Sequence, residues 1–342
     1  MKNHIHLVNT HGIGDVIMSL PTINSILSTG IKLSMTVKSK VEASVINSAL
    51  GLNGEIEFIF FKDYSNKGIK GYFDFFRKLR NFNVDIIIPS ISVGKTKYNL
   101  MALLSKAKIR TGLSGGGLDF NHVKLSLDER RHKVEVNYEI FRGIVKKLSL
   151  DINLEKDVTM PIFSGKKDCN INAGQLVAIA PGCGILEKHK RWPLEKYAEL
   201  ANRLLKKNFS IAILGGNAEK ELAEEIVNLI HDNKNVYNFV GKLSIESTLS
   251  TLYNSEVLVA NCNGVSHMAS LIRNIDIVGL YGPTDYKFTG PYSNNLHALT
   301  LGLDCSPCYS ASNLTGCGNP VCMKNIDVVS VESIVSNICS RK

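Results

Sequence analysis

The sequence has few charged residues and no long apolar run. Charged residues make up 21% of its 342 positions and hydrophobic residues 44%, a balance that excludes intrinsically disordered, collagen-like and coiled-coil proteins. No stretch reaches the roughly 18 apolar residues that a membrane-spanning helix needs. Residues 1–10 also lack the apolar segment of a secretory signal. We therefore expect a globular, cytoplasmic protein.

Two well-known phosphate-binding signatures are also missing. The first glycine-bearing turn does not have the G-x-G-x-x-G spacing of a dinucleotide site. Gly94, Lys95 and Thr96 resemble the end of a P-loop, but Pro89 stands where that motif begins with glycine. Proline has no amide hydrogen to donate to a phosphate. The sequence therefore predicts neither a dinucleotide fingerprint nor a P-loop.

Basic residues are concentrated in the first half of the chain. Residues 1–150 hold 22 Lys and Arg against 12 Asp and Glu, a net charge of +10, whereas residues 151–342 hold 18 against 19, a net charge of −1. A basic surface can bind nucleic acid, an anionic membrane or an acidic substrate. Composition alone leaves these three classes of partner open.

Short β-branched runs alternate with longer amphipathic segments along the chain, which is the pattern of βα units on parallel sheets. We predict an α/β protein with two doubly wound, Rossmann-like domains at 1–160 and 175–342, joined by a polar linker at 161–174. The expected site is a cleft at the carboxyl ends of both sheets, because α/β sheets bind ligands at that edge. The expected strands are 4–9, 32–38, 55–61, 84–90, 108–112, 176–180, 210–214, 236–240, 256–260 and 277–281, and the expected helices are 16–28, 41–50, 70–81, 99–106, 135–148, 194–207, 218–230, 245–254, 265–272 and 331–338.

The turn after the first expected strand carries Gly12, Gly14 and Asp15. The two glycines allow a tight turn, and the amides that enter the following helix can bind an anion. Asp15 would lie at the carboxyl end of the sheet, where it could take part in chemistry. Asp is also a common helix N-cap, so a purely structural role is an alternative.

Four expected strand ends in the second half are followed by glycine-bearing turns. The first contains Gly184 and leads into the basic residues 188–191, the second leads to Glu219, the third contains Gly264 and the fourth Gly282. Glycine lets the backbone approach a ligand, and helix N-termini and lysines attract phosphate. Each turn alone could be a solvated loop, but four together favour a phosphorylated ligand.

Taken in order, these motifs resemble glycosyltransferase family 9, the ADP-heptose:lipopolysaccharide heptosyltransferases. The resemblance covers most of the chain, and it implies the GT-B fold, in which two Rossmann-like domains face a central cleft. Each motif is modest alone, but their order and spacing are specific. The motifs are G-I-G-D-V-I-x-x-L-P at 12–21, the basic W-P turn at 190–193, L-G-G at 214–216, N-x-x-G-x-x-H-M-A at 261–269 and Y-G-P-T-D at 281–285.

The resemblance also implies roles for individual residues. Asp15 matches the general base that deprotonates an acceptor hydroxyl during an inverting sugar transfer. Lys190 matches a lysine that neutralises the diphosphate of the donor as it leaves. Gly12 and Gly14 belong to the turn that would meet a phosphate or the acceptor. The other positions matched to donor contacts are Gly184, Glu219, Cys262, Asn263, Gly264, His267, Gly282 and Thr284.

One position departs from the family pattern. Where the family usually has Asn-Asp-Ser-Gly, this chain has Asn261, Cys262, Asn263 and Gly264, and the missing Asp is one that contacts hydroxyls of the donor sugar. A thiol cannot replace a charged acceptor. This leaves open a donor other than the usual heptose, a substitute contact, or reduced activity.

The chain has no Asp-x-Asp pair, which fits a transferase that needs no catalytic metal or other cofactor. Four cysteines within 18 residues could nevertheless hold a structural zinc or an iron–sulfur cluster. Reduced thiols or disulfides in a loop-rich segment are the favoured alternative. These residues are Cys305, Cys308, Cys317 and Cys322.

The resemblance implies that the basic residues of the first half of the chain bind an anionic substrate. Between residues 62 and 110, eleven basic residues are interleaved with aromatic ones, which suits a lipid-linked saccharide acceptor and peripheral contact with the inner membrane. A nucleotide-sugar donor would occupy the second domain. Two alternatives are kept: a non-catalytic nucleotide-sugar-binding protein, and a basic nucleic-acid-binding protein with a metal site made of the four cysteines, although no nucleic-acid-binding motif appears.

Overall fold

The chain folds into two compact units, Met1–Ile162 (unit 1) and Phe163–Lys342 (unit 2). The computed structural model describes residues 3–114, 119–128, 130–163, 175–184, 186–309 and 317–341. Most of the expected linker, residues 164–174, lies outside these ranges. Within them, no helix is both long enough and apolar enough to cross a lipid bilayer.

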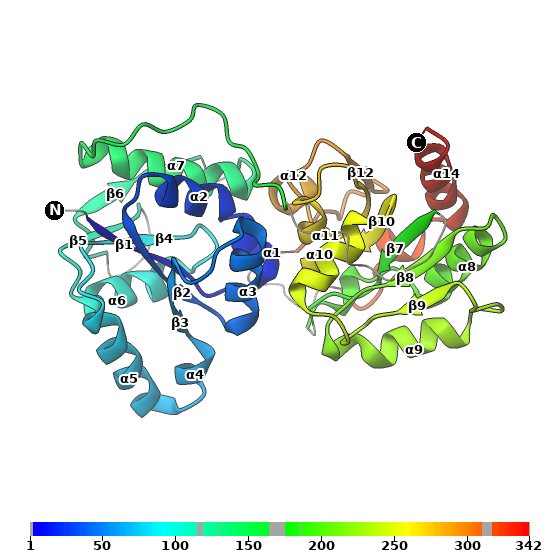
Figure 1. Ribbon diagram of the computed structural model, residues 1–342, viewed down its shortest axis with the longest axis horizontal. Coiled ribbons are helices and arrows are strands. Elements are labelled where there is room, and N and C mark those ends of the chain that lie inside the picture. Colours follow the sequence, from blue (N-terminus) through cyan, green and yellow to red (C-terminus); the bar gives the residue numbers. More distant parts are fainter. Residues whose placement is uncertain are drawn as a thin grey trace. The chain divides into compact units, whose positions relative to one another are not determined.

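Unit 1 is built around one parallel six-stranded sheet (Figure 1). The central strand of this sheet is buried on both faces, which requires helices on both sides, and the crossover connections supply them. The strands are β1 (His4–Asn9), β2 (Lys32–Val37), β3 (Glu57–Phe60), β4 (Ile86–Pro89), β5 (Ile109–Leu113) and β6 (Val123–Leu125). Their order across the sheet is β3-β2-β1-β4-β5-β6.

The helices of unit 1 follow the prediction except in three places: near the N-terminus, at α4, which was not predicted, and at α6, which begins four residues earlier than expected. The single helix expected at 16–28 is wrong, because the structure has two helices that are separated at Met18 and Ser19. Pro21 lies at the start of the second and has no N–H to offer the carbonyl of Ile17. The helices are α1 (Ile13–Ile17), α2 (Leu20–Ser28), α3 (Lys40–Leu50), α4 (Lys62–Ser65), α5 (Gly68–Asn81), α6 (Lys95–Ser105) and α7 (Lys133–Lys147).

Unit 2 has its own parallel six-stranded sheet. Its strands are β7 (Leu176–Ala180), β8 (Ser210–Ile213), β9 (Val236–Asn238), β10 (Val257–Asn261), β11 (Asp276–Leu280) and β12 (Leu296–Leu299). Its helices are α8 (Leu194–Leu205), α9 (Lys220–Asn228), α10 (Ile245–Tyr253), α11 (Gly264–Ala269), α12 (Tyr286–Thr289), α13 (Val321–Lys324) and α14 (Val328–Cys339), with 3-10 turns at Lys188–Lys190 and Asn217–Glu219.

Both sheets have the same strand order. Counted from the first strand of each unit, the order is 3-2-1-4-5-6, which is the doubly wound arrangement. The direction of winding reverses between β1 and β4 in unit 1 and between β7 and β10 in unit 2. Ligands of such sheets bind outside the carboxyl ends of the two strands at this switch point. Each unit therefore has one edge at which a site is expected.

The core of unit 2 holds the basic turn in place. Trp192 and Tyr197 are fully buried in this core, and their rings meet edge to face at 4.9 Å. The indole Nε1 of Trp192 donates to the backbone oxygen of Ile326 at 3.0 Å. Because Lys190 precedes Trp192 by only two residues, this packing determines where the lysine backbone lies.

Candidate active site

Asp15 lies inside the first turn of α1 and does not cap it. The N-cap is Gly12, and no side chain accepts a hydrogen bond there. The helix begins three residues earlier than predicted, so the alternative that Asp15 is merely an N-cap is wrong. Its carboxylate is left for other contacts at the carboxyl end of β1.

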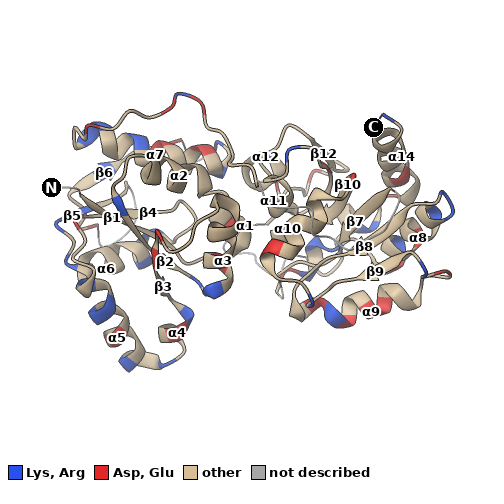
Figure 2. Ribbon diagram, viewed as in Figure 1, with Lys and Arg blue, Asp and Glu red and all other residues tan. Residues whose placement is uncertain are grey.

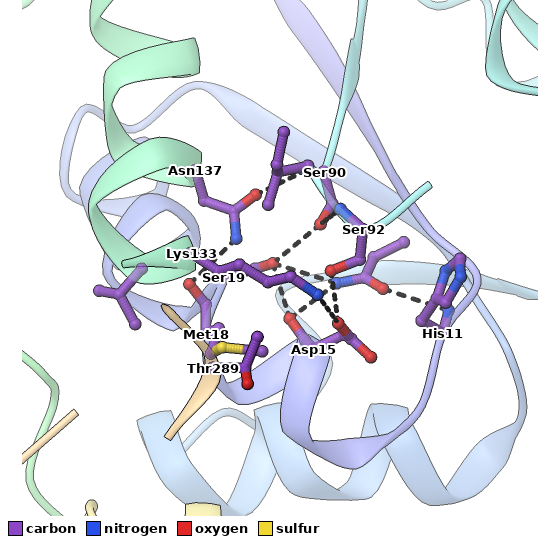
Figure 3. Close-up of polar contacts among 12 residues, drawn as sticks. His11, Asp15, Met18, Ser19, Ser90, Ser92, Lys133, Asn137 and Thr289 are labelled. Carbon is purple, nitrogen blue, oxygen red and sulfur yellow. Dashed lines mark hydrogen bonds and ion pairs between the residues drawn. The ribbon is translucent and has the colours of Figure 1, made fainter. Parts of the chain in front are cut away.

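The carboxylate of Asp15 meets two side chains from distant parts of unit 1 (Figure 3). The hydroxyl of Ser92, which follows β4, donates to Oδ1 of Asp15. Nζ of Lys133, the first residue of α7, lies 3.5 Å from the same oxygen. A nearby ammonium favours the ionised form of a carboxylate. The hydroxyl and the ammonium thus orient Asp15 and favour its charged state, as a general base requires.

Buried amides hold the backbone of this site. Nδ2 of Asn9 donates to the backbone oxygen of Asp15 at 3.0 Å. Asn137 of α7 accepts from the backbone N–H of Ile91 at 2.9 Å and donates to the backbone oxygen of Met18 at 3.2 Å. The loop that carries Ser92 and the helix that carries Asp15 are therefore joined through one side chain (Figure 3).

Two further nitrogen-bearing side chains lie at this turn, His11 from the turn itself and Lys97 from α6. Nζ of Lys97 donates to Oγ1 of Thr10 at 3.0 Å, and burial lowers the pKa of this lysine. Burial is also the main reason that the pKa of His11 is lowered, with the Asp15 carboxylate opposing the shift. His11 is therefore a neutral imidazole near neutral pH.

In unit 2, the turn after β7 encloses a carboxylate. Nδ2 of Asn263 donates to the backbone oxygen of Gly182 at 3.0 Å, and a Cβ at Gly182 would collide with the carboxylate of Glu219. Glu219 also accepts from the backbone N–H of Gly216 at 2.6 Å. Burial raises its pKa, against the opposing effects of this hydrogen bond and of Arg191. The glycine therefore makes room for a partly desolvated acid at the switch point.

Lys190 is held in a closed group of three side chains. Only 5% of the residue is exposed, its Nζ lies 3.1 Å from Oε2 of Glu187, and it stands 3.3 Å from the ring centroid of Tyr309. The hydroxyl of Tyr309 donates to Oε1 of the same glutamate at 2.5 Å. A cation between a carboxylate and an aromatic face is well stabilised. The ammonium is thus preorganised, and its anionic partner is a side chain of the protein.

Other predicted donor residues have structural contacts. Asn263 is the N-cap of α11, where its Oδ1 accepts from the N–H of Ser266, and its Nδ2 also donates to Ala180. Its amide is therefore already engaged by the protein. A Cβ at Gly282 would be 2.6 Å from Sγ of Cys322, so this glycine permits close packing against α13. His267 and Thr284 are buried, and Gly264 and Cys262 are partly exposed.

The cysteine-rich segment is connected to this half of the site. The backbone N–H groups of Cys308 and Tyr309 both donate to the oxygen of Pro283, at 3.0 and 2.8 Å. Of the four cysteines, Cys305, Cys317 and Cys322 form no disulfide with a residue that the structure describes. In the part of the chain that the structure describes, no group of three or more His, Cys, Asp or Glu side chains is arranged to hold a metal ion. Residues 310–316, between two of these cysteines, lie outside that part.

Sequence reasoning missed four residues of the two groups described above. Ser92 and Lys133 could have been found, because Ser92 follows a central strand and Lys133 begins a helix. No sequence pattern indicated that Glu187 or Tyr309 would contact Lys190. They are 122 residues apart, and only the folded chain brings them to the same lysine.

A family model described as glycosyltransferase family 9 (heptosyltransferase) matches residues 72–318, well over half of the chain. The chain belongs to glycosyltransferase family 9. The resemblance seen in the sequence motifs is thereby confirmed, although the match begins after Asp15.

Curated relatives of this family 9 chain are heptosyltransferases. It is 28% identical over 149 residues to lipopolysaccharide heptosyltransferase 2 of Escherichia coli (strain K12), which covers 42% of each chain. It is 26% identical over 193 residues to lipooligosaccharide heptosyltransferase 2 of Campylobacter jejuni serotype O:6, which covers 53% of this chain and 58% of the relative. The chain spans 33% to 58% of the length of the curated heptosyltransferase 2 relatives that it matches.

Solved structures extend the likeness to the whole fold. The structure of E. coli ADP-heptose lps heptosyltransferase II has a TM-score of 0.75 to this chain, with 19% identity and 99% of both chains covered. Identity at this level shows the fold alone. The predicted GT-B fold, with two Rossmann-like units, is confirmed.

Proposed function

We propose that this family 9 protein is an inverting, metal-independent glycosyltransferase. It would move a heptose or related sugar from a nucleotide-diphosphate donor, with ADP as the expected nucleotide, to an anionic lipopolysaccharide or other surface-glycan acceptor. The observation that carries this proposal is the carboxylate of Asp15 at the switch point of unit 1, which is oriented by contacts with Ser92 and Lys133. Family membership supplies the reaction class.

The reaction requires one base and one stabilised leaving group. Asp15 takes the proton from an acceptor hydroxyl while that oxygen attacks the anomeric carbon of the donor. The new bond forms on the face opposite the breaking bond to the diphosphate, so the anomeric configuration inverts. Lys190 neutralises the charge that develops on the departing diphosphate. Its ammonium would thereby supply the charge that a divalent metal provides in other transferases.

Unit 2 would bind the donor and unit 1 the acceptor. Glu219, partly desolvated beside the turn after β7, would accept hydrogen bonds from ribose hydroxyls. The remaining donor positions keep the assignments that the resemblance gives them; these are Gly184, Cys262, Asn263, Gly264, His267, Gly282 and Thr284. The +10 charge of residues 1–150 favours an anionic acceptor at the cytoplasmic face of the inner membrane.

A transfer assay with a panel of donors tests the function and its metal independence. The protein is incubated with ADP-, GDP- and UDP-linked sugars and a truncated lipopolysaccharide acceptor, with and without EDTA. We expect transfer from the ADP-linked heptose that EDTA does not change, and a thermal shift with the same donor, since a ligand that binds only the folded state stabilises it.

Other outcomes of the assay favour other functions. A strict requirement for Mg²⁺ or Mn²⁺ would contradict metal independence. Donor binding without transfer would support a non-catalytic nucleotide-sugar-binding protein. Tight, salt-sensitive binding of RNA or DNA without any binding of nucleotide sugars would support a nucleic-acid-binding protein.

Glu187 should compete with the donor for Lys190. The variant Glu187→Gln removes the negative charge 3.1 Å from Nζ but keeps an oxygen for the Tyr309 hydroxyl. We expect it to bind a nucleoside diphosphate about three- to tenfold more tightly, the equivalent of one partly desolvated ion pair. Tyr309→Ala should act in the opposite direction, because it exposes the ammonium to water.

Calorimetric titration with ADP and with adenosine measures both effects. Adenosine has no phosphate, so its affinity should be the same in the two variants and in the unaltered protein. Weaker ADP binding by Glu187→Gln would mean that this glutamate contacts the donor and does not compete with it.

A further inference from the structure

Helix α5 presents an apolar stripe to solvent. Its inner face buries Gly71, Phe75 and Leu79. On another face, Ile69 is 79% exposed, Phe73 72% and Tyr72 43%, at the i, i+3, i+4 spacing that places side chains together on a helix. Soluble proteins seldom leave such a group uncovered unless the surface binds something.

The charge around this stripe is strongly positive (Figure 2). Two of the basic residues, Arg77 and Arg80, line a surface hollow of 350 Å³ together with Phe73 and Asp74. Arg77 forms an ion pair with Asp74 at 3.0 Å, and Nε of Arg80 donates to the backbone oxygen of Leu104 at 2.9 Å. The remaining N–H groups of the two guanidinium groups can donate to a phosphate. Residues 67–81 contain the exposed basic residues Lys67, Lys70, Arg77, Lys78 and Arg80 and one acidic residue, Asp74.

An anionic bilayer fits this surface better than a second copy of the chain. A symmetric dimer through α5 would bring its four basic residues against the same four on the partner. A helix with apolar side chains on one face and Lys and Arg beside them instead lies in the plane of an anionic membrane, with its apolar residues among the acyl chains. An anionic bilayer would thus contact both the basic residues and the apolar stripe of α5.

Contacts within unit 1 connect this surface to the edge that carries Asp15. α5 follows the carboxyl end of β3, and the ring of Tyr72 lies 6.2 Å from that of Phe61. Nζ of Lys97 stands 4.2 Å from the centroid of Phe61 and 3.0 Å from Oγ1 of Thr10. Thr10 is in the turn that leads to Asp15, so the first half of α5 and the proposed base lie at the same edge of one sheet.

We propose that the exposed face of α5, formed by Ile69, Tyr72 and Phe73 with the surrounding basic residues, docks on an anionic lipid bilayer. Docking would place the edge that carries Lys97 and Asp15 near the membrane surface, where a lipid-linked acceptor is found. The part that concerns the acceptor rests on the proposed function, whereas the docking itself does not.

Co-sedimentation with vesicles tests the docking surface. The full chain is mixed with vesicles of phosphatidylglycerol and phosphatidylethanolamine, or of phosphatidylcholine alone. We expect binding to the anionic vesicles that weakens with salt, and little binding to phosphatidylcholine. The variant Ile69→Ser/Phe73→Ser keeps every charge and should lower the vesicle affinity at least about tenfold.

A matched control removes exposed apolar residues from unit 2. Leu229→Ser/Val329→Ser changes residues that are 42% and 58% exposed, and it should leave vesicle binding unchanged. Vesicle binding by Ile69→Ser/Phe73→Ser equal to that of the unaltered protein would overturn the proposal. Equal binding to phosphatidylcholine, binding of RNA in place of vesicles, or a dimer that this variant abolishes would also overturn it.

Transfer to a soluble, lipid-free acceptor separates the docking from the proposed function. The Ile69→Ser/Phe73→Ser variant should retain the full rate with such an acceptor, because neither residue lies among the contacts of Asp15 or Lys190. Loss of transfer to the soluble acceptor in this variant would contradict a pure docking role. Vesicle binding without transfer by any form of the protein would instead count against the proposed function and leave the docking surface in place.

Discussion

Replacing Asp15 by asparagine is expected to lower kcat about 10²- to 10⁴-fold, which is the range of a general base. Asparagine has the same shape, and its Oδ1 can still accept from the hydroxyl of Ser92, but its amide cannot take a proton. Donor affinity and the melting temperature should therefore stay close to those of the unaltered protein. The measurement is the initial rate of sugar transfer, followed by a thermal melt of each variant.

Two companion variants make the result on Asp15 specific. Asp128→Asn removes an exposed carboxylate of the same unit whose ion-pair partner is 4.0 Å away, and it should leave kcat unchanged. His11→Gln removes the neutral imidazole beside Asp15 and should reduce kcat much less than Asp15→Asn. If the histidine variant were the inactive one and the asparagine variant retained its rate, the base would be His11.

Replacing Lys190 by methionine is expected to lower kcat/KM about 10²- to 10³-fold, the usual loss when one group that stabilises developing charge is removed. Methionine keeps much of the side-chain volume in a position that is 5% exposed, so the fold should survive. The affinity for a nucleoside diphosphate should fall, while the affinity for the nucleoside without phosphate should not.

The matched control for Lys190 is Lys206→Met, which changes an exposed lysine just after α8. It should leave both affinities and the transfer rate unchanged. Equal loss of nucleoside and nucleoside-diphosphate binding in Lys190→Met would contradict the assignment, because that pattern would indicate a disturbed pocket and not a lost phosphate contact.

The sheets were readable from the sequence because their central strands are buried on both faces. β1 and β7 are continuous runs in which every residue is buried, and such runs stand out against the amphipathic helices between them. β6 and β12 were missed. Both are edge strands, of three and four residues.

The candidate site was predicted only where its residues lie in local motifs. Asp15, Lys190 and Glu219 each follow a strand in a turn with a recognisable pattern, and all three lie at the switch point of their sheets. For Asn263, which was assigned to the donor, the structure adds that its amide caps α11 and holds the turn after β7. The sequence could not show these contacts, since a cap and a ligand contact both place a small polar residue before a helix.

The sequence by itself determined the fold class, the family and the positions of Asp15, the proposed base, and Lys190, the lysine proposed to bind the diphosphate, because periodicity and motif spacing are local properties of the chain. Only the tertiary structure decided which side chains control those two groups. Ser92 and Lys133 reach Asp15 because β1 and β4 are neighbours in the sheet and α7 packs near them. Glu187 and Tyr309 enclose Lys190 because the cysteine-rich segment is bonded to the turn after β11. Contacts between residues so far apart in the sequence depend on the tertiary fold, and no local sequence pattern predicts them.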